Sequence, residues 1–169
     1  LLREGYELEQ WSLWSYVSAL MAGAYGHPFG FTRSLVGTSL GAQLAERGKL
    51  IEMADPTDPV RRIGLVRAMT PDITFLHAPL GDSHGNVAFS PPYGEGFYGA
   101  LAAKRGVIVT VERVVSSDLL GTLPHFRPLP AHRVLAVCEE PFGAHPQPLH
   151  VAPAELRGVP ARARQRADD

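Results

Sequence analysis

One short segment of the chain combines the side chains best suited to binding a ligand. Residues 81–86 read Gly-Asp-Ser-His-Gly-Asn and follow an apolar run over residues 73–78 that is typical of a buried strand. In open α/β sheets, ligand sites gather in loops beyond the carboxyl ends of strands. The Asn86 amide can bond an acyl carbonyl, and Gly85 permits a close backbone approach. Because Asp and Asn also close turns by bonding their own backbone, two interpretations stay open for Asp82, Gly85 and Asn86: a substrate site or a structural turn.

Other residues with chemical potential stand more isolated in the sequence. Glu112 lies in a β-branched run beside Arg113, where it is either a carboxylate at a site or half of a solvent-exposed ion pair. His84 has the chemistry of a base, but no serine-elbow pattern accompanies it. The sole cysteine, Cys138, cannot form an internal disulfide, and no Cys/His spacing is typical of zinc. We therefore expect no metal site.

The elements that must position these residues alternate between helix and strand. Apolar residues at steps of three and four predict a helix over residues 8–25, which Gly26 and Pro28 end. The β-branched run over residues 106–115 is the clearest strand. We further expect helices over 39–47 and 98–104, strands over 73–78, 87–89 and 133–138, and irregular segments over 53–59 and 123–130. This order predicts an α/β fold with a mainly parallel sheet flanked by helices.

Length and composition fit one globular domain. The chain has 169 residues, 45% hydrophobic and 20% charged, with a formal net charge of -1. We predict a single α/β domain over residues 1–152 and a charged C-terminal tail over residues 153–169. The balanced charge disfavours a nucleic-acid partner, and no apolar stretch reaches the length that spans a membrane. A single cysteine and the lack of a signal-peptide pattern favour a cytoplasmic protein.

Several motifs resemble those of family I coenzyme A transferase α subunits, in matching order and spacing. Residues 72–78 and 81–87 resemble the family's "D-V-A-(L/I)-I-x-A" strand and "A-D-x-x-G-N" turn. Residues 102–115 resemble its "A-A-K" helix end and the strand "T-I-V-(T/E)-V-E-E-I-V" that follows. Residues 27–29 and 141–146 are similar to its "L-P-F" passage and to the "P-Y-G-A-H-P" segment of the glutaconate CoA-transferase branch. The chain thus resembles the C-terminal portion of the α subunit of a glutaconate/3-oxoacid CoA-transferase.

The resemblance implies a fold and a division of labour between subunits. The fold is that of the CoA-transferases, which is NagB/RpiA-like, with an N-terminal part missing because the family's early glycine-rich loop has no counterpart here. The family moves CoA between an acyl-CoA and a carboxylic acid through a glutamate of the β subunit, within "S-E-N-G". This chain contains no E-N-G sequence, so we expect no catalytic residue in it. Coenzyme A is then a substrate rather than a bound cofactor, a β subunit is the partner in a hetero-oligomer, and Asp82, Gly85, Asn86 and Glu112 line the site.

Two other functions fit the same resemblance. Some relatives are CoA-ester hydrolases that open rings in steroid degradation, and their α subunit carries a catalytic glutamate near the first helix. Residues 10–14 hold no glutamate here, and only Glu7 and Glu9 stand shortly before them, which disfavours the hydrolase. A non-catalytic ligand-binding or scaffold protein of the same fold is the second alternative, because fold alone does not decide function.

Overall fold

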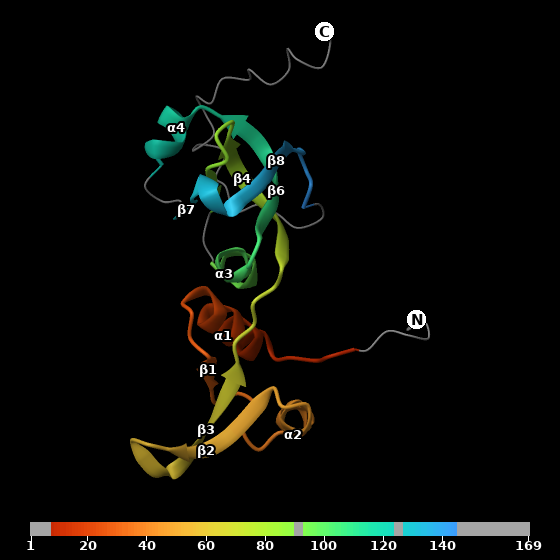
Figure 1. Ribbon diagram of the computed structural model, residues 1–169, viewed down its shortest axis with the longest axis vertical. Coiled ribbons are helices and arrows are strands. Elements are labelled where there is room, and N and C mark those ends of the chain that lie inside the picture. Colours follow the sequence, from red (N-terminus) through yellow and green to blue (C-terminus); the bar gives the residue numbers. More distant parts are fainter. Residues whose placement is uncertain (1–7, 90–92, 124–126, 145–169) are drawn as a thin grey trace. The chain divides into compact units, whose positions relative to one another are not determined.

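The chain forms two compact units in the computed structural model, which describes residues 8–89, 93–123 and 127–144. The first unit comprises residues 1–70 and the second residues 71–169; Figure 1 colours the first from red to yellow and the described part of the second from yellow to blue. The single domain that the sequence predicts over residues 1–152 stays a prediction, and each unit is described by itself. The tail predicted from residue 153 onward lies outside the described residues.

The first unit is an antiparallel sheet with two helices against one face (Figure 1). Its strands lie in the order β1-β3-β2. Val66 of the central strand stands opposite both Gly30 and Leu50 on the covered face. There Val66 and Leu50 form a core with Ala19 and Leu44 from the two helices. The elements are α1 (Leu13–Ala24), β1 (Phe29–Thr32), α2 (Ser39–Glu46), β2 (Leu50–Asp55) and β3 (Asp58–Arg67).

The start of α1 and the structure of residues 53–59 differ from the sequence prediction. Helix α1 begins at Leu13 rather than at residue 8, because Ser12 is its N-cap and accepts a hydrogen bond from the Ser15 backbone N–H at 3.3 Å. The predicted end at Gly26 and the predicted second helix are confirmed. The prediction of an irregular segment over residues 53–59 is wrong, because these residues belong to the β2–β3 hairpin. The turn-forming Asp and Pro residues occupy only the tip of this hairpin.

The second unit is built on a mixed sheet in the order β7-β5-β4-β6-β8. Strands β4, β6 and β8 run parallel, while β5 pairs antiparallel with both β4 and β7. The sequence predicts a mainly parallel sheet, whereas the observed sheet is mixed, with two parallel and two antiparallel strand pairs. A short turn after β4 can only return the chain antiparallel, whereas the helix α3 allows the parallel crossover to β6. The elements are β4 (Ile73–Asp82), β5 (Val87–Phe89), α3 (Glu95–Ala102), β6 (Gly106–Val115), α4 (Ser117–Gly121), β7 (Arg127–Leu129), the 3-10 turn η1 (Ala131–Arg133) and β8 (Val134–Glu139).

The core of the second unit lies between α3 and the sheet. Val109 and Val111 of β6 are fully buried there against Phe97 and Ala100 of α3. The strands predicted over 73–78, 87–89, 106–115 and 133–138 are confirmed as β4, β5, β6 and β8. The predicted loop over 123–130 contains the short strand β7, which the sequence does not predict. No helix in the described part of the chain is both long and apolar enough to cross a membrane.

Candidate functional site

The turn after β4 is closed around the carboxylate of Asp82, which is only 1% exposed. Its Oδ1 accepts hydrogen bonds from the backbone N–H groups of His84 at 2.9 Å and of Asn86 at 2.8 Å. Its Oδ2 accepts from Asn86 Nδ2 at 2.7 Å and from Ser117 Oγ at 2.7 Å. Gly85 completes the turn with a φ of 91°, in the left-handed region that glycine adopts without strain. Both oxygens of Asp82 and the amide nitrogen of Asn86 therefore hold the turn together.

The hydrogen bonds fix the charge of Asp82 and the orientation of His84. Burial opposes ionisation of Asp82, but the bonds donated by Asn86, Ser117 and His84 outweigh it and lower the pKa of this carboxyl below its usual value. Ser117 Oγ has one hydrogen and gives it to Asp82, so its contact with His84 Nδ1, at 3.0 Å, requires His84 Nδ1 to be the donor. A chain of polar groups thus connects the buried carboxylate to the exposed imidazole of His84.

A hollow of about 290 Å³ opens beside this turn. The turn contributes Asp82, His84 and Gly85 to its lining, and strands β6 and β8 contribute Val114 and residues 134–137. One wall is therefore polar and the other apolar. The volume lies just below the range of roughly 300–1,000 Å³ that is usual for whole small-molecule sites, so the hollow has room for part of a ligand.

Glu112 belongs to a separate polar group on β4 and β6. Its Oε1 lies 2.9 Å from His77 Nε2, and its Oε2 accepts a hydrogen bond from the Phe142 backbone N–H at 2.9 Å. His77 Nδ1 lies 2.8 Å from Thr110 Oγ1, because the parallel register places His77 opposite Thr110. Glu112 therefore anchors the turn after β8 to the sheet, and it is not among the residues that line the hollow.

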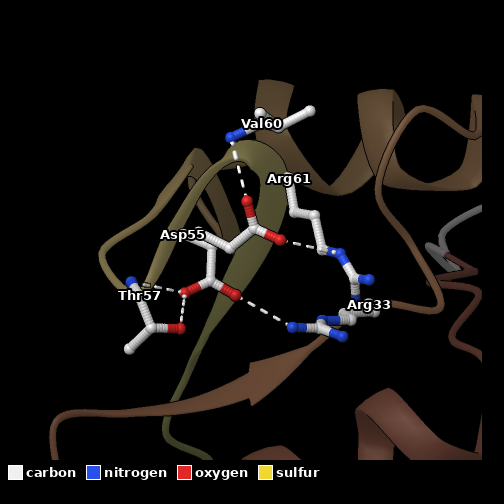
Figure 2. A network of polar contacts seen from close by, with 6 residues as sticks. Arg33, Asp55, Thr57, Val60 and Arg61 are labelled. Carbon is white, nitrogen blue, oxygen red and sulfur yellow. Dashed lines mark hydrogen bonds and ion pairs between the residues drawn. The ribbon is translucent and has the colours of Figure 1, made fainter.

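A third polar group closes the tip of the β2–β3 hairpin, and Figure 2 shows the Asp55 carboxylate between Thr57 and Arg33. Asp55 Oδ1 accepts from Thr57 Oγ1 at 2.6 Å and from Thr57 N–H at 2.9 Å, and Oδ2 accepts from Arg33 Nη2 at 2.8 Å. These bonds, with that of the Thr57 hydroxyl the largest, lower the pKa of Asp55 to about 2. Asp58 pairs with Arg61 at 3.0 Å in the same hairpin.

The structure thus groups three of the four predicted site residues and separates the fourth. Asp82, Gly85 and Asn86 share one turn, while Glu112 is engaged elsewhere. Sequence reasoning missed Ser117, which is 35 residues from Asp82 and reaches it only because the register aligns Asp82 with Val115. Within the described residues, no group of three or more His, Cys, Asp or Glu side chains is placed to hold a metal ion.

Comparison with known proteins decides the family. The family model described as "Coenzyme A transferase" matches residues 2–128. The chain belongs to this family. It is 34% identical over 144 residues to the α subunit of the 3-oxoadipate CoA-transferase of Pseudomonas knackmussii, an alignment that covers 85% of this chain and 49% of that protein. The predicted family and the α-subunit-like character of the chain are thereby confirmed.

Two further relatives extend this result. The cholesterol ring-cleaving hydrolase IpdA subunit of Rhodococcus jostii is 41% identical over 83 residues, which are 46% of this chain and 27% of that protein. The crystal structure of glutaconate coenzyme A-transferase from Acidaminococcus fermentans matches the fold with a TM-score of 0.70 at 23% identity, over 83% of this chain and 48% of that one. The fold is therefore the α/β fold of the CoA-transferases, and the chain spans about half the length, 49%, of the Pseudomonas relative.

Proposed function

We propose that the chain is the α-subunit portion of a CoA-transferase that moves CoA between an acyl-CoA and a carboxylic acid, with the nucleophilic glutamate on a partner β subunit. One observation carries this proposal: the two carboxylates that the sequence marks for a site are both already engaged. Asp82 accepts four hydrogen bonds, and each oxygen of Glu112 has a partner. A carboxylate held in this way must break its own contacts to attack a thioester, which makes an external nucleophile the simpler arrangement.

The proposed reaction follows from carboxylate chemistry. The partner's carboxylate attacks the thioester carbon of the acyl-CoA, and the CoA thiolate leaves, giving a mixed anhydride. The thiolate then attacks the glutamyl carbonyl of that anhydride, so that the first carboxylic acid leaves and CoA is held as an enzyme thioester. An incoming carboxylate reverses these two steps and departs as the new acyl-CoA. No net oxidation occurs, and no cofactor other than the substrate CoA is required.

In this proposal the turn at residues 82–86 lines part of the substrate site. Its rigidity comes from the buried Asp82, and Gly85 and the exposed His84, which carries a polar imidazole, line the hollow. Preorganised polar groups can stabilise charge that develops in a transition state, because they need not reorganise during the reaction. Asp82 and Asn86 then position the turn, and Glu112 positions the neighbouring segment around Phe142.

Reconstitution tests the proposal. The isolated 169-residue chain, assayed with an acyl-CoA and acetate, is expected to give no transfer. Transfer should appear when the cognate β subunit is added, together with the part of the α subunit that this chain does not span. Turnover by the isolated chain would refute the division of labour between subunits. A partner in which the glutamate is replaced by glutamine is the matched control, and it should restore nothing.

A ring-cleaving CoA-ester hydrolase is the second candidate, favoured by the 41% identity to the IpdA subunit over 83 residues. Glu9, one of the two glutamates shortly before the first helix, already accepts a hydrogen bond at its Oε1 from Trp11 Nε1 at 2.7 Å. The two reactions separate by their need for an acceptor: a transferase releases little free CoA without a carboxylic acid, whereas a hydrolase releases it with water alone. If the reconstituted complex supports neither reaction, a non-catalytic role of the same fold takes the place of both.

A further inference from the structure

The imidazole of His84 stands at the end of a hydrogen-bond chain that begins at the buried Asp82 carboxylate. Ser117 Oγ donates its one hydrogen to Asp82 Oδ2 at 2.7 Å, and it accepts from His84 Nδ1 at 3.0 Å. The opposite direction would leave two acceptor oxygens 2.7 Å apart with no hydrogen between them. A neutral imidazole carries one N–H, so a hydrogen on Nδ1 leaves Nε2 as an acceptor. The chain of hydrogen bonds therefore fixes the tautomer of His84.

The acceptor Nε2 is open to a ligand. His84 is exposed, and it lines the hollow of about 290 Å³ beside the turn. Its backbone is held independently of the ring, because the His84 N–H donates to Asp82 Oδ1 at 2.9 Å. Within the described part of the chain, the contact with Ser117 is the only hydrogen bond that the His84 side chain makes. A donor that enters the hollow can therefore bond Nε2 without breaking a contact of the protein.

The remaining lining decides which kind of group fits this hollow. Strands β6 and β8 supply an apolar wall, which consists of Val114, Val134, Leu135, Ala136 and Val137. No Lys or Arg is among the described residues that line the hollow, and its one carboxylate is that of Asp82. A phosphate or a carboxylate would lose hydration there without gaining a counter-charge, which costs free energy. The hollow therefore fits an uncharged group that combines apolar surface with a hydrogen-bond donor.

One part of the proposed substrates has this combination. The thioester offers acceptors only, the nucleotide end of CoA carries phosphate charge, and the carboxylic acid substrate is itself an anion. The pantetheine arm of CoA is uncharged, and it alternates methylene groups with amides that each carry an N–H donor. We infer that the hollow binds this arm and that His84 Nε2 accepts a hydrogen bond from one of its amide N–H groups. The inference rests on the proposed function and names the part of the substrate that the turn binds.

Nitrogen NMR of the whole 169-residue chain with isotope-labelled histidine tests the inference. The signals of His84 are identified by their absence in His84→Gln. We expect the neutral ring to carry its hydrogen on Nδ1, and the Nε2 resonance to shift saturably when S-acetylpantetheine is added. A matched ligand, in which ester oxygens replace both amide N–H groups, should bind about three- to tenfold more weakly. A hydrogen on Nε2 instead, an unchanged Nε2 resonance, or equal binding of the two ligands would overturn the inference.

Two substitutions of His84 separate a ligand contact from a structural one. Glutamine can place its amide oxygen near the position of Nε2, but it leaves no donor at the position of Nδ1 for Ser117. Asparagine can place its amide nitrogen near Nδ1 and keep the Ser117 contact, but it has no acceptor where Nε2 lies. With binding followed by the Gly85 amide resonance, S-acetylpantetheine should bind at least about threefold more weakly to His84→Asn and less than about twofold more weakly to His84→Gln. The opposite order would mean that His84 only closes the turn, and it would overturn the inference.

The failure of this inference and the failure of the proposed function have different signs. Because binding is measured without turnover, failed reconstitution of transfer counts against the proposed function only. In the reconstituted enzyme, His84→Asn should raise KM for the acyl-CoA at least about threefold, whereas His84→Gln should stay close to the wild type. Reconstituted transfer with an unchanged KM for the acyl-CoA in His84→Asn overturns the inference and leaves the proposed function standing.

Discussion

Replacing Asp82 by asparagine tests whether this one carboxylate organises the turn after β4. The change conserves shape but removes the charge and one acceptor. The amide oxygen must face the backbone N–H groups of His84 and Asn86, because these donors cannot turn away. The new NH2 group then faces the two remaining donors, Asn86 Nδ2 and Ser117 Oγ, at positions where the carboxylate oxygen now accepts at 2.7 Å. The Ser117 hydroxyl can rotate to accept, but the Asn86 amide must flip or lose its bond.

The hydrogen-bond count gives the size of the effect. Two bonds to a charged acceptor become bonds to a neutral one, a loss of about 1 kcal/mol each, and one further bond is broken at about 1–2 kcal/mol. We therefore expect Asp82→Asn to lower the free energy of unfolding by about 3–4 kcal/mol at pH 7. Asp72→Asn is the matched control, because the Asp72 side chain is 78% exposed and lies 3.7 Å from Lys104. It should cost less than about 1 kcal/mol.

Urea unfolding followed by far-UV circular dichroism measures both variants. Trp11 and Trp14 both lie in the first unit, so their fluorescence monitors the unit that does not contain Asp82. The folded-state pKa of Asp82 is lowered, so its contribution is present above the ordinary carboxyl pKa and is lost as the pH falls through the folded value. The difference between Asp82→Asn and wild type should therefore shrink in acid. A loss under about 1 kcal/mol at pH 7, or one equal to that of Asp72→Asn, would refute the reasoning.

Two other predictions concern acid stability and the substrate role of the turn. Asp55 has a folded-state pKa of about 2 against an ordinary value of 3.8, so the wild type should lose stability as the pH falls from about 5 towards 2. In urea unfolding measured across that pH range, Asp55→Asn should lose less stability than the wild type. Identical pH profiles of the two proteins would contradict this prediction. Asn86→Ala and Ser117→Ala are a matched pair, because each removes one side-chain hydrogen bond to Asp82 Oδ2. If Asn86 also contacts the substrate, kcat/KM of the reconstituted enzyme should fall further in Asn86→Ala than in Ser117→Ala. Equal losses, matched by equal losses of stability, would make Asn86 purely structural.

Much of the second unit could be predicted from the sequence, because its signals are local. The β-branched run of β6 and the apolar run of β4 both favour strands, and Gly85 and Asn86 favour a turn whatever element follows. The first unit was predicted less well. The hairpin over residues 53–59 combines turn residues with exposed strand residues, so its strands carry little apolar pattern. Strand β1 pairs with β3 across more than 30 residues, from Thr32 opposite Gly64 to Phe29 opposite Arg67, and no local signal shows that pairing.

The candidate site divides in the same way. The sequence placed Asp82, Gly85 and Asn86 in one segment because they are neighbours in the chain. It could not place Ser117 beside Asp82, since that contact depends on the parallel register of β4 and β6. It also could not assign Glu112, whose neighbour in sequence is Arg113 but whose hydrogen-bond partners are His77 and Phe142, from a second strand and a distant turn.

The sequence by itself determined the family, the main strands of the second unit and the residues of the turn, because motif order, β-branching and turn chemistry are properties of short segments. Tertiary structure alone decided the mixed sheet, the division into two units, the burial of Asp82 and the hollow beside its turn. The physical reason is that burial, charge and hydrogen-bond partners come from contacts between segments, such as Asp82 with Ser117, whose distance along the chain does not reveal that they meet.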